Sequence, residues 1–191
     1  MTSLQKKNIR VIIDLQGYQR DSNRVRGIGR YSIQLAKSLI RKSPHNTYIL
    51  FANSSLYDFK NDFSQELNDA NLNVIYFEWN PPGKINDDIF SSYSRNSVAK
   101  QIRSYALSVI NADIIILTSF FDGFKDNTLI DFDGEYKLPP VIAVVYDLIP
   151  LILPKLYLNN DEEYKKFYYQ KIKQLKNLDA LLTLSESARN E

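Results

Sequence analysis

The chain has 191 residues, of which 44% are apolar and 24% charged, with a formal net charge of +2. This length suffices for one good-sized core, and so small a charge, spread along the chain, gives no reason to expect a nucleic-acid partner. Cysteine is absent, which excludes disulfides, thiolate metal sites and a cysteine nucleophile. No apolar run has the length of a membrane span, and residues 1–8 lack a signal-peptide pattern. We therefore expect a cytoplasmic protein.

Residues 9–42 have the pattern of a strand, a loop and a helix. The apolar, β-branched run at 10–15 predicts a buried strand. Residues 16–25 show no apolar periodicity and are expected to form a loop. From Ile28 onward apolar residues recur at helical spacing, and Pro44 ends this predicted helix, because a residue before proline avoids the helical region.

Apolar segments alternate with helical patterns through the rest of the chain. The further predicted strands cover residues 47–51, 72–77, 114–117, 141–146 and 180–184, and the further helices cover 56–67, 98–110 and 161–176. Loops are expected at 80–96, 119–140 and 147–160. The apolar stripe of the middle helix consists of Val98, Ile102, Tyr105, Ala106, Val109 and Ile110.

This alternation predicts an α/β fold: a Rossmann-like, doubly wound parallel sheet with helices on both faces and its first strand at the centre. Ligands of such sheets bind beyond the carboxyl ends of the strands. The loops of interest are therefore 16–30, 118–137, 147–160 and 185–187. The one histidine, His45, falls at the opposite edge, so we expect no catalytic role for it. Without cysteine or a second histidine, no transition-metal site and no Ser-His-Asp triad is expected.

The start of the first helix has the chemistry of an anion site. Gly27 and Gly29 let a bound group approach the backbone, and the unpaired N–H groups of a helix start favour a phosphate or carboxylate. Arg26 and Arg30 add positive charge on either side. The alternative is a glycine-bearing turn with solvated arginines.

A dinucleotide site is a second alternative, because Gly27-x-Gly29 opens a helix after the first strand. Three features argue against it. Ser32 stands at the third glycine position, and the loop before Gly27 is longer than the usual tight turn. The second strand is followed by Asn53, where an acid should hold the ribose.

Four segments together resemble bacterial retaining glycosyltransferases of family four. They are residues 24–36, which contain Gly-Ile-Gly-Arg-Tyr; residues 118–123, Thr-Ser-Phe-Phe-Asp-Gly; residues 145–151, Val-Tyr-Asp-Leu-Ile-Pro-Leu; and residues 179–189, Asp-Ala-Leu-Leu-Thr-Leu-Ser-Glu-Ser-Ala-Arg. They occur in the order expected for that family and span most of the chain.

The resemblance implies a GT-B enzyme, in which two Rossmann-like domains face a cleft. Residues 1–191 would form the N-terminal, acceptor-side domain, and the C-terminal donor domain would follow, since a predicted helix begins just before the chain ends. The expected partners are a nucleotide-sugar donor, as substrate, and a glycan or lipid-linked acceptor of polysaccharide biosynthesis. No metal or other cofactor is expected.

In such enzymes the glycine loop approaches the donor diphosphate, and here it comprises Arg26, Gly27, Gly29, Arg30 and Tyr31. The resemblance thus agrees with the anion site inferred from the backbone chemistry. We expect Gly29→Val to leave the domain folded and to block the phosphate sterically.

Tyr146 stands where many relatives have a histidine near the reacting sugar. Tyrosine is a poor base, because its reference pKa is about 10. The adjacent Asp147 has two interpretations: it accepts or positions the proton of the acceptor hydroxyl, or it caps the following turn. Asp122, next to Gly123 on the acceptor side, has the same two interpretations.

Ser185 and Glu186, also on the acceptor side, are interpreted as a helix cap that faces the cleft. The lysines of residues 161–176, with Lys171 on the flank of the apolar stripe, form either a solvated face or a peripheral contact with anionic lipid at the inner face of the membrane. A scaffold domain that kept the fold and lost transfer chemistry is the non-enzymatic alternative.

Overall fold

A computed structural model describes residues 8–85, 92–132 and 134–190 of the chain. Six parallel strands form one sheet in the order β3-β2-β1-β4-β5-β6. Their bounds are β1 Arg10–Asp14, β2 Thr47–Asn53, β3 Asn73–Trp79, β4 Ile114–Leu117, β5 Val141–Val145 and β6 Ala180–Thr183. The predicted fold class and the central place of the first strand are confirmed. Residues 1–7, for which no signal peptide is expected, lie outside the described part.

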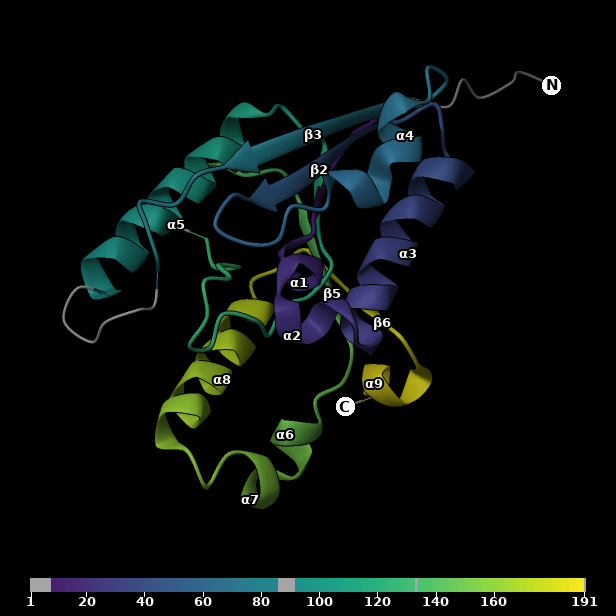
Figure 1. Cartoon of the computed structure of the whole chain (residues 1–191). Helices are drawn as coiled ribbons and strands as arrows, with labels where there is room; N and C mark the ends of the chain where they lie inside the picture. The colour runs from purple at the N-terminus through teal and green to yellow at the C-terminus, as the bar shows by residue number, and fades with distance from the viewer. Residues whose placement is uncertain (1–7, 86–91, 133, 191) are drawn as a thin grey trace.

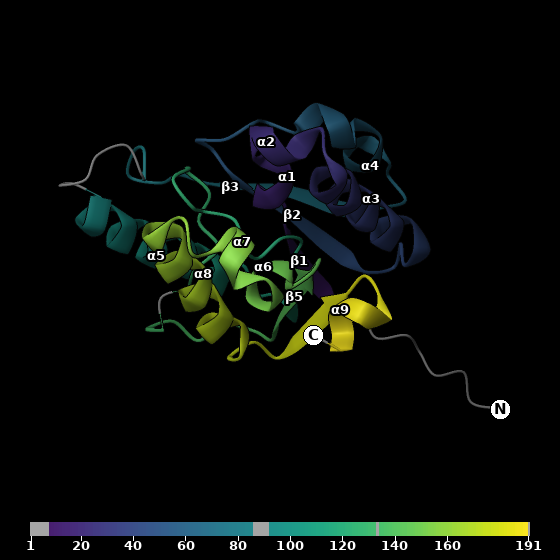
Figure 2. The same cartoon turned by 90° about the horizontal axis from the view of Figure 1, so that it is seen from below.

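Helices cover both faces of the sheet (Figures 1 and 2). One face is covered by α5 (Ser92–Val109) and α8 (Glu162–Leu175), and the other by α3 (Gly27–Lys42) with the short η1 (Lys60–Phe63) and α4 (Ser64–Asn68). The remaining helical segments are α1 Gln16–Gln19, α2 Asp21–Arg24, α6 Ile149–Ile152, α7 Pro154–Tyr157 and α9 Glu186–Asn190.

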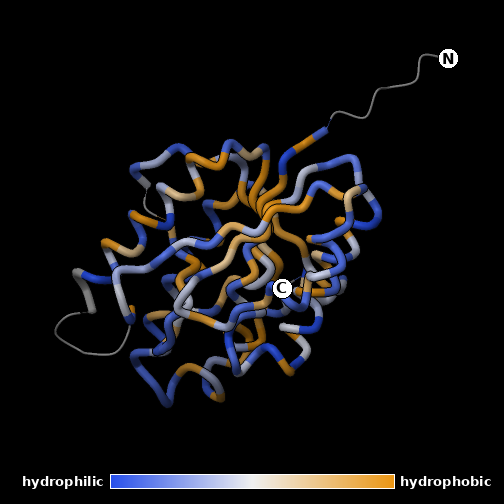
Figure 3. The backbone as a smooth tube through the Cα atoms, turned by 45° about the horizontal axis from the view of Figure 1, so that its top comes forward, coloured by the Kyte–Doolittle hydropathy of each residue, from blue (hydrophilic) through white to orange (hydrophobic). Residues whose placement is uncertain are grey.

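The two faces bury separate cores because successive strand residues point in opposite directions. Ile12 packs in the core beneath α5 and α8, while its neighbour Ile13 packs in the core beneath α3. Both side chains are fully buried. Strands that are buried on both faces read as continuous apolar runs, and Figure 3 shows these runs meeting at the centre of the molecule.

The predicted loop at 16–25 instead contains two single-turn helices, α1 and α2. Apart from Gly17 and Tyr18, its buried residues carry amide side chains, namely Gln16, Gln19 and Asn23. Gln16 Nε2 donates to the Leu129 carbonyl at 2.8 Å, and Gln19 Nε2 donates to the Asn53 carbonyl at 3.0 Å. Because these hydrogen bonds take the place of apolar contacts, the segment shows no apolar period.

The predicted middle helix exists as α5, and its predicted apolar stripe is confirmed in part, since Ala106 is buried and Ile102 and Ile110 pack against the core. Val98, Tyr105 and Val109 are exposed, at 44%, 55% and 55%. The buried face also carries Arg103 and Leu107, which are fully buried and were not part of the predicted stripe. The helix is turned so that Arg103 reaches Asp14 at the end of β1, with Nη2 2.6 Å from the carboxylate.

Other predicted boundaries shift. Helix α5 begins at Ser92, inside the predicted loop 80–96, of which residues 86–91 lie outside the described part. The predicted helix 56–67 is reduced to η1 and α4, and the predicted loop 147–160 contains α6 and α7. Within residues 8–85, 92–132 and 134–190, the structure has no helix with the length and apolar character needed to cross a membrane.

Candidate functional site

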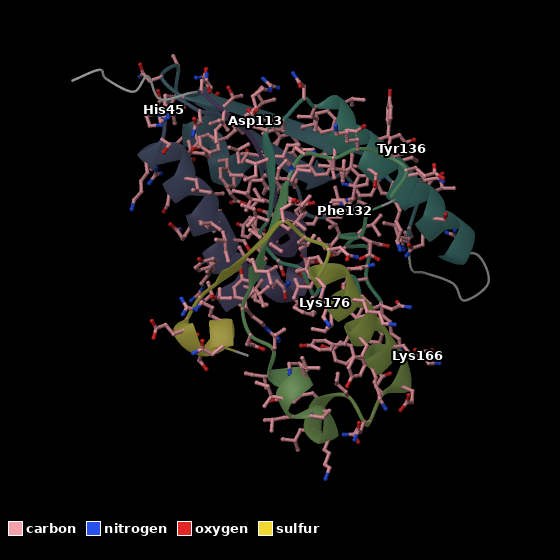
Figure 4. The ribbon with its side chains drawn as sticks, turned by 180° about the vertical axis from the view of Figure 1, so that it is seen from behind. His45, Asp113, Phe132, Tyr136, Lys166 and Lys176 are labelled. Carbon is pink, nitrogen blue, oxygen red and sulfur yellow. The ribbon has the colours of Figure 1, made fainter. Side chains whose placement is uncertain are left out.

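The candidate site lies at the edge of the sheet where the strands end. The strand order reverses between β1 and β4, and loops at such a switch point are the usual ligand-binding position. His45 and Asp113, which precede β2 and β4, lie at the opposite end of the molecule from α6 and α7 (Figures 1 and 4). The placement of His45 away from the site is thus confirmed.

The start of α3 is open toward solvent. Arg26 is the N-cap residue, and no side chain of the described residues caps this end. Gly27 is exposed, and a Cβ added to it would meet no described atom within 4 Å. The side chains of Arg26, Arg30 and Tyr31 are exposed as well. The arrangement combines unpaired N–H groups, the positive end of the helix dipole and two guanidinium groups, as an anion site requires.

Gly29 has a different role from Gly27. It is buried, and a Cβ at this position would lie 2.4 Å from the Asn23 carbonyl oxygen and 2.7 Å from the Arg24 Cα. The missing side chain lets the backbone of α2 pack directly on α3. The reason predicted for the effect of Gly29→Val, a clash with a bound phosphate, was therefore wrong. The valine side chain would instead clash with the protein's own backbone at α2.

Tyr146 connects β5 to the start of α3. Its hydroxyl lies 3.1 Å from the carbonyl oxygens of Ile28 and Thr118 and 3.3 Å from Ser32 Oγ, and its ring packs edge-on against Tyr31 with centroids 5.7 Å apart. Burial raises the pKa of Tyr146 to about 12, although the Ser32 hydrogen bond acts in the opposite direction. Tyr146 therefore positions the helix start and cannot serve as a base near neutral pH.

Asp147 is exposed beside this tyrosine. Its Oδ1 accepts from the backbone N–H of Ile149 at 3.1 Å, as in an Asx turn, which agrees with the interpretation that Asp147 caps the turn after β5. Burial raises the pKa of the nearby Tyr164; Arg20 acts against this, and Asp147 and Asp122 add to it. Arg20, Asp122 and Asp147 therefore each lie within electrostatic reach of Tyr164. Asp147 is the member of this group that combines a carboxylate with an exposed position.

Asp122 is an internal anchor. It is 3% exposed; its Oδ1 accepts from Arg20 Nη1 at 2.9 Å and from Asn23 Nδ2 at 2.8 Å, and its Oδ2 accepts from Ser119 Oγ. The adjacent Gly123 has φ +103°, the left-handed region that favours glycine. Of the two interpretations of Asp122, the structure supports the structural one, because its carboxylate is enclosed and hydrogen-bonded.

The crevice at the switch point is filled by the chain itself. Leu129 belongs to the buried core and exchanges hydrogen bonds with Gln16, whose amide also contacts Asp14. Asn53, at the end of β2, is fully buried and donates to Gln16 Oε1 at 3.0 Å. Because this position is filled by protein side chains, the ribose of a dinucleotide could not bind here. The structure therefore argues against the dinucleotide site.

The other predicted residues have local partners. Ser185 Oγ accepts from the Ala188 N–H at 3.1 Å at the start of α9, as a helix cap does, with Glu186 exposed in the first turn. Lys171, predicted on the flank of the apolar stripe, does not belong to a solvated or lipid-contacting face: it is 3% exposed, and its Nζ lies 2.5 Å from Asp131 Oδ1. Burial lowers the pKa of Lys171, and the charge of Asp131 opposes this.

Sequence reasoning missed several side chains that shape this edge. They are Arg20 and Asn23 around Asp122, and the buried pair Asp14–Arg103. Their positions in the sequence carry no sign of this pairing, because the partners lie roughly 90–100 residues apart. Among the described residues, no three His, Asp or Glu side chains lie close enough together to hold a metal ion.

No protein-family model matches the chain. Three curated proteins are similar to it, each named serotype-specific mannosyltransferase WbdA and each from Escherichia coli. One is 29% identical over 182 residues, which is 95% of this chain and 21% of that protein. The second is 30% identical over 100 residues, 52% of this chain and 12% of its own length. The third is 27% identical over 142 residues, 74% of this chain and 17% of its own length.

The chain thus spans about a fifth of the length of the first of these relatives. The alignment nevertheless includes nearly the whole Rossmann-like domain described above, rather than a single motif. Over most of its length the chain is therefore similar to proteins that are named mannosyltransferases.

Proposed function

We propose that the chain is the N-terminal, acceptor-side domain of a retaining GT-B glycosyltransferase of family four. The whole enzyme would transfer a sugar, mannose by analogy with the relatives, from a nucleotide-sugar to a glycan or lipid-linked acceptor in polysaccharide biosynthesis. The C-terminal donor domain would complete the cleft. The observation that carries the proposal is the similarity to one mannosyltransferase over 95% of the chain.

The chemical groups at the start of α3 also support the proposal, because they suit a diphosphate. A nucleotide-sugar carries a diphosphate, and an uncapped helix start with an exposed glycine and two exposed arginines favours such an anion. Gly27 would allow close approach of the phosphate, and Arg26 and Arg30 would neutralise its charge. Tyr31 and Tyr146 hold the helix start in place through their ring contact.

Asp147 is our candidate for contact with the acceptor. One of its carboxylate oxygens accepts from the Ile149 N–H, which fixes the side chain at the end of β5. The other would accept a hydrogen bond from the acceptor hydroxyl and orient it. Tyr146 would act as a positioning residue, since its own hydroxyl is directed at backbone carbonyls of α3 and β4.

Arg30→Ala tests the donor-phosphate site. In the complete enzyme we expect donor affinity to fall by tenfold or more, because loss of one charge-assisted contact costs about 1.5–3 kcal/mol. The melting temperature should stay unchanged, since Arg30 is exposed. Titration with a mannose-bearing nucleotide such as GDP-mannose measures the effect. Lys42→Ala, in the last turn of the same helix, removes one charge at the far end and serves as the matched control.

An unchanged donor affinity in the Arg30→Ala enzyme would remove this helix start from the donor site. A fall of equal size in the Lys42→Ala enzyme would show that the effect comes from net charge and not from a local contact.

The isolated residues 1–191 should have no transferase activity. Catalysis requires both reactants in one geometry, and in the proposed architecture half of the cleft belongs to the donor domain. Turnover of GDP-mannose with a mannose oligosaccharide, measured against a buffer control, gives the test. Activity above that control would contradict the two-domain proposal.

A further inference from the structure

The end of α2 is joined directly to the start of α3, beside which it lies (Figures 1 and 2). The Asn23 carbonyl oxygen accepts a hydrogen bond from the Arg26 N–H at 2.8 Å, and Arg26 is the N-cap residue of α3. A Cβ on Gly29 would lie 2.4 Å from the same oxygen, so this carbonyl also borders the first turn of the helix. The position of the Asn23 carbonyl therefore determines where the N-cap of α3 lies.

The side chain of Asn23 is held as firmly as its carbonyl. Its Nδ2 donates to Asp122 Oδ1 at 2.8 Å, and Asn23 and Asp122 are only 7% and 3% exposed. The carboxylate of Asp122 is fixed in turn by Arg20 Nη1 at 2.9 Å and by Ser119 Oγ. Asn23 thus connects the loop after β4 to the start of α3 through one buried side chain and one carbonyl.

The hydrogen bond from Arg26 to Asn23 also determines which N–H groups remain for a ligand. The hydrogen bonds within α3 begin with the Arg30 N–H, which donates to the Arg26 carbonyl at 3.0 Å. The N–H groups of residues 27–29 have no hydrogen-bond acceptor among the described residues. Their directions follow from the backbone of Arg26, and a hydrogen bond weakens steeply as its angle departs from linearity. A displaced N-cap would therefore turn these donors away from a bound phosphate.

We propose that Asn23 is a positioning residue of the donor-phosphate site: it holds the N-cap of α3, and Asp122 holds Asn23. The proposal rests on the donor site proposed above at the start of α3. Asparagine suits this place because its side-chain amide donates to a carboxylate without adding a charge. Aspartate has the same shape but would place a second carboxylate beside Asp122, and alanine has no group that reaches it.

Asn23→Ala and Ser119→Ala together test the positioning role. Each removes one hydrogen bond to the Asp122 carboxylate, so each should lower the denaturation midpoint by a similar amount. Only Asn23→Ala releases the carbonyl that binds the Arg26 N–H. In the 191-residue chain we expect hydrogen exchange at that N–H, followed by NMR, to be faster by roughly tenfold or more in Asn23→Ala and unchanged in Ser119→Ala.

Donor binding in the complete enzyme gives the second readout. We expect the Kd and the KM for GDP-mannose to rise roughly tenfold in Asn23→Ala, while the KM for the acceptor stays the same and Ser119→Ala changes neither constant. Asn23→Ser is the second variant in case Asn23→Ala fails to fold: it keeps a polar group, but its side chain is one bond shorter and lies beyond hydrogen-bonding distance of Asp122. The expected changes are the same as for Asn23→Ala. Equal changes in the Ser119→Ala enzyme, or unchanged Arg26 exchange in both Asn23 variants, would overturn the positioning role.

The two readouts separate this inference from the proposed function. If Arg30→Ala weakens donor binding but the Asn23 variants bind GDP-mannose as the unmodified enzyme does, the positioning role is wrong and the donor site stands. If Arg26 exchange is faster in the Asn23 variants but neither they nor Arg30→Ala alter donor binding, the proposed donor site is wrong, while the hold of Asn23 on the start of α3 stands.

Discussion

Arg103→Met is expected to destabilise the chain by about 3–5 kcal/mol, the usual cost of breaking a buried ion pair by removal of one partner. Arg103 and Asp14 are 0% and 1% exposed and lie 2.6 Å apart. Without the guanidinium, the Asp14 carboxylate stays buried with hydrogen bonds from Gln16 as its remaining described contacts. Urea unfolding followed by circular dichroism measures the free energy.

Two further variants show whether the unpaired charge is the cause. Asp14→Asn combined with Arg103→Met removes both charges and should recover part of the lost stability, because the amide oxygen can still accept from the Gln16 N–H. Arg30→Met, at an exposed position, should change the unfolding free energy by less than about 0.5 kcal/mol. If Arg103→Met lowered the free energy of unfolding as little as Arg30→Met does, the buried pair would not contribute to the stability of the fold.

Gly29→Ala should destabilise the chain by about 1–3 kcal/mol, the usual cost of overpacking. Its Cβ would lie 2.4 Å from the Asn23 carbonyl oxygen and 2.8 Å from that of Arg24, so α2 must move away from α3. Gly27→Ala is the matched variant two residues earlier. Its Cβ meets nothing within 4 Å, and loss of a flexible glycine should leave stability unchanged or raise it by about 0.4–1 kcal/mol.

The same pair of variants separates folding from binding. Gly27→Ala should stay fully folded and yet weaken donor binding in the complete enzyme, since its methyl group projects where the phosphate would approach. Chemical denaturation and GDP-mannose titration measure the two effects independently. Equal stability of the two variants would contradict the packing role of Gly29, and undiminished donor binding by Gly27→Ala would contradict the close approach of the phosphate at Gly27.

The sequence by itself determined the strands, because each central strand is buried on both faces and is therefore a nearly continuous apolar run. The short run at 114–117 coincides with β4 for this reason. It also determined where α3 ends, because Pro44 excludes the helical conformation for the residue before it. The cap at Ser185 follows from its own side chain, which reaches a backbone N–H three residues ahead. All of these features depend on local chemistry.

Only the tertiary structure decided which polar residues are buried and what they contact. The amides of Gln16 and Gln19 build α1 by hydrogen bonds to distant carbonyls, and Arg103 turns α5 by pairing with Asp14. Gly29 is needed because α2 folds back on it, which no spacing in the sequence indicates. Apolar periodicity in the sequence predicts only which residues are buried in some apolar core. A buried hydrogen bond or ion pair requires one particular partner, and that partner lies far away in the sequence, so only the folded structure reveals it.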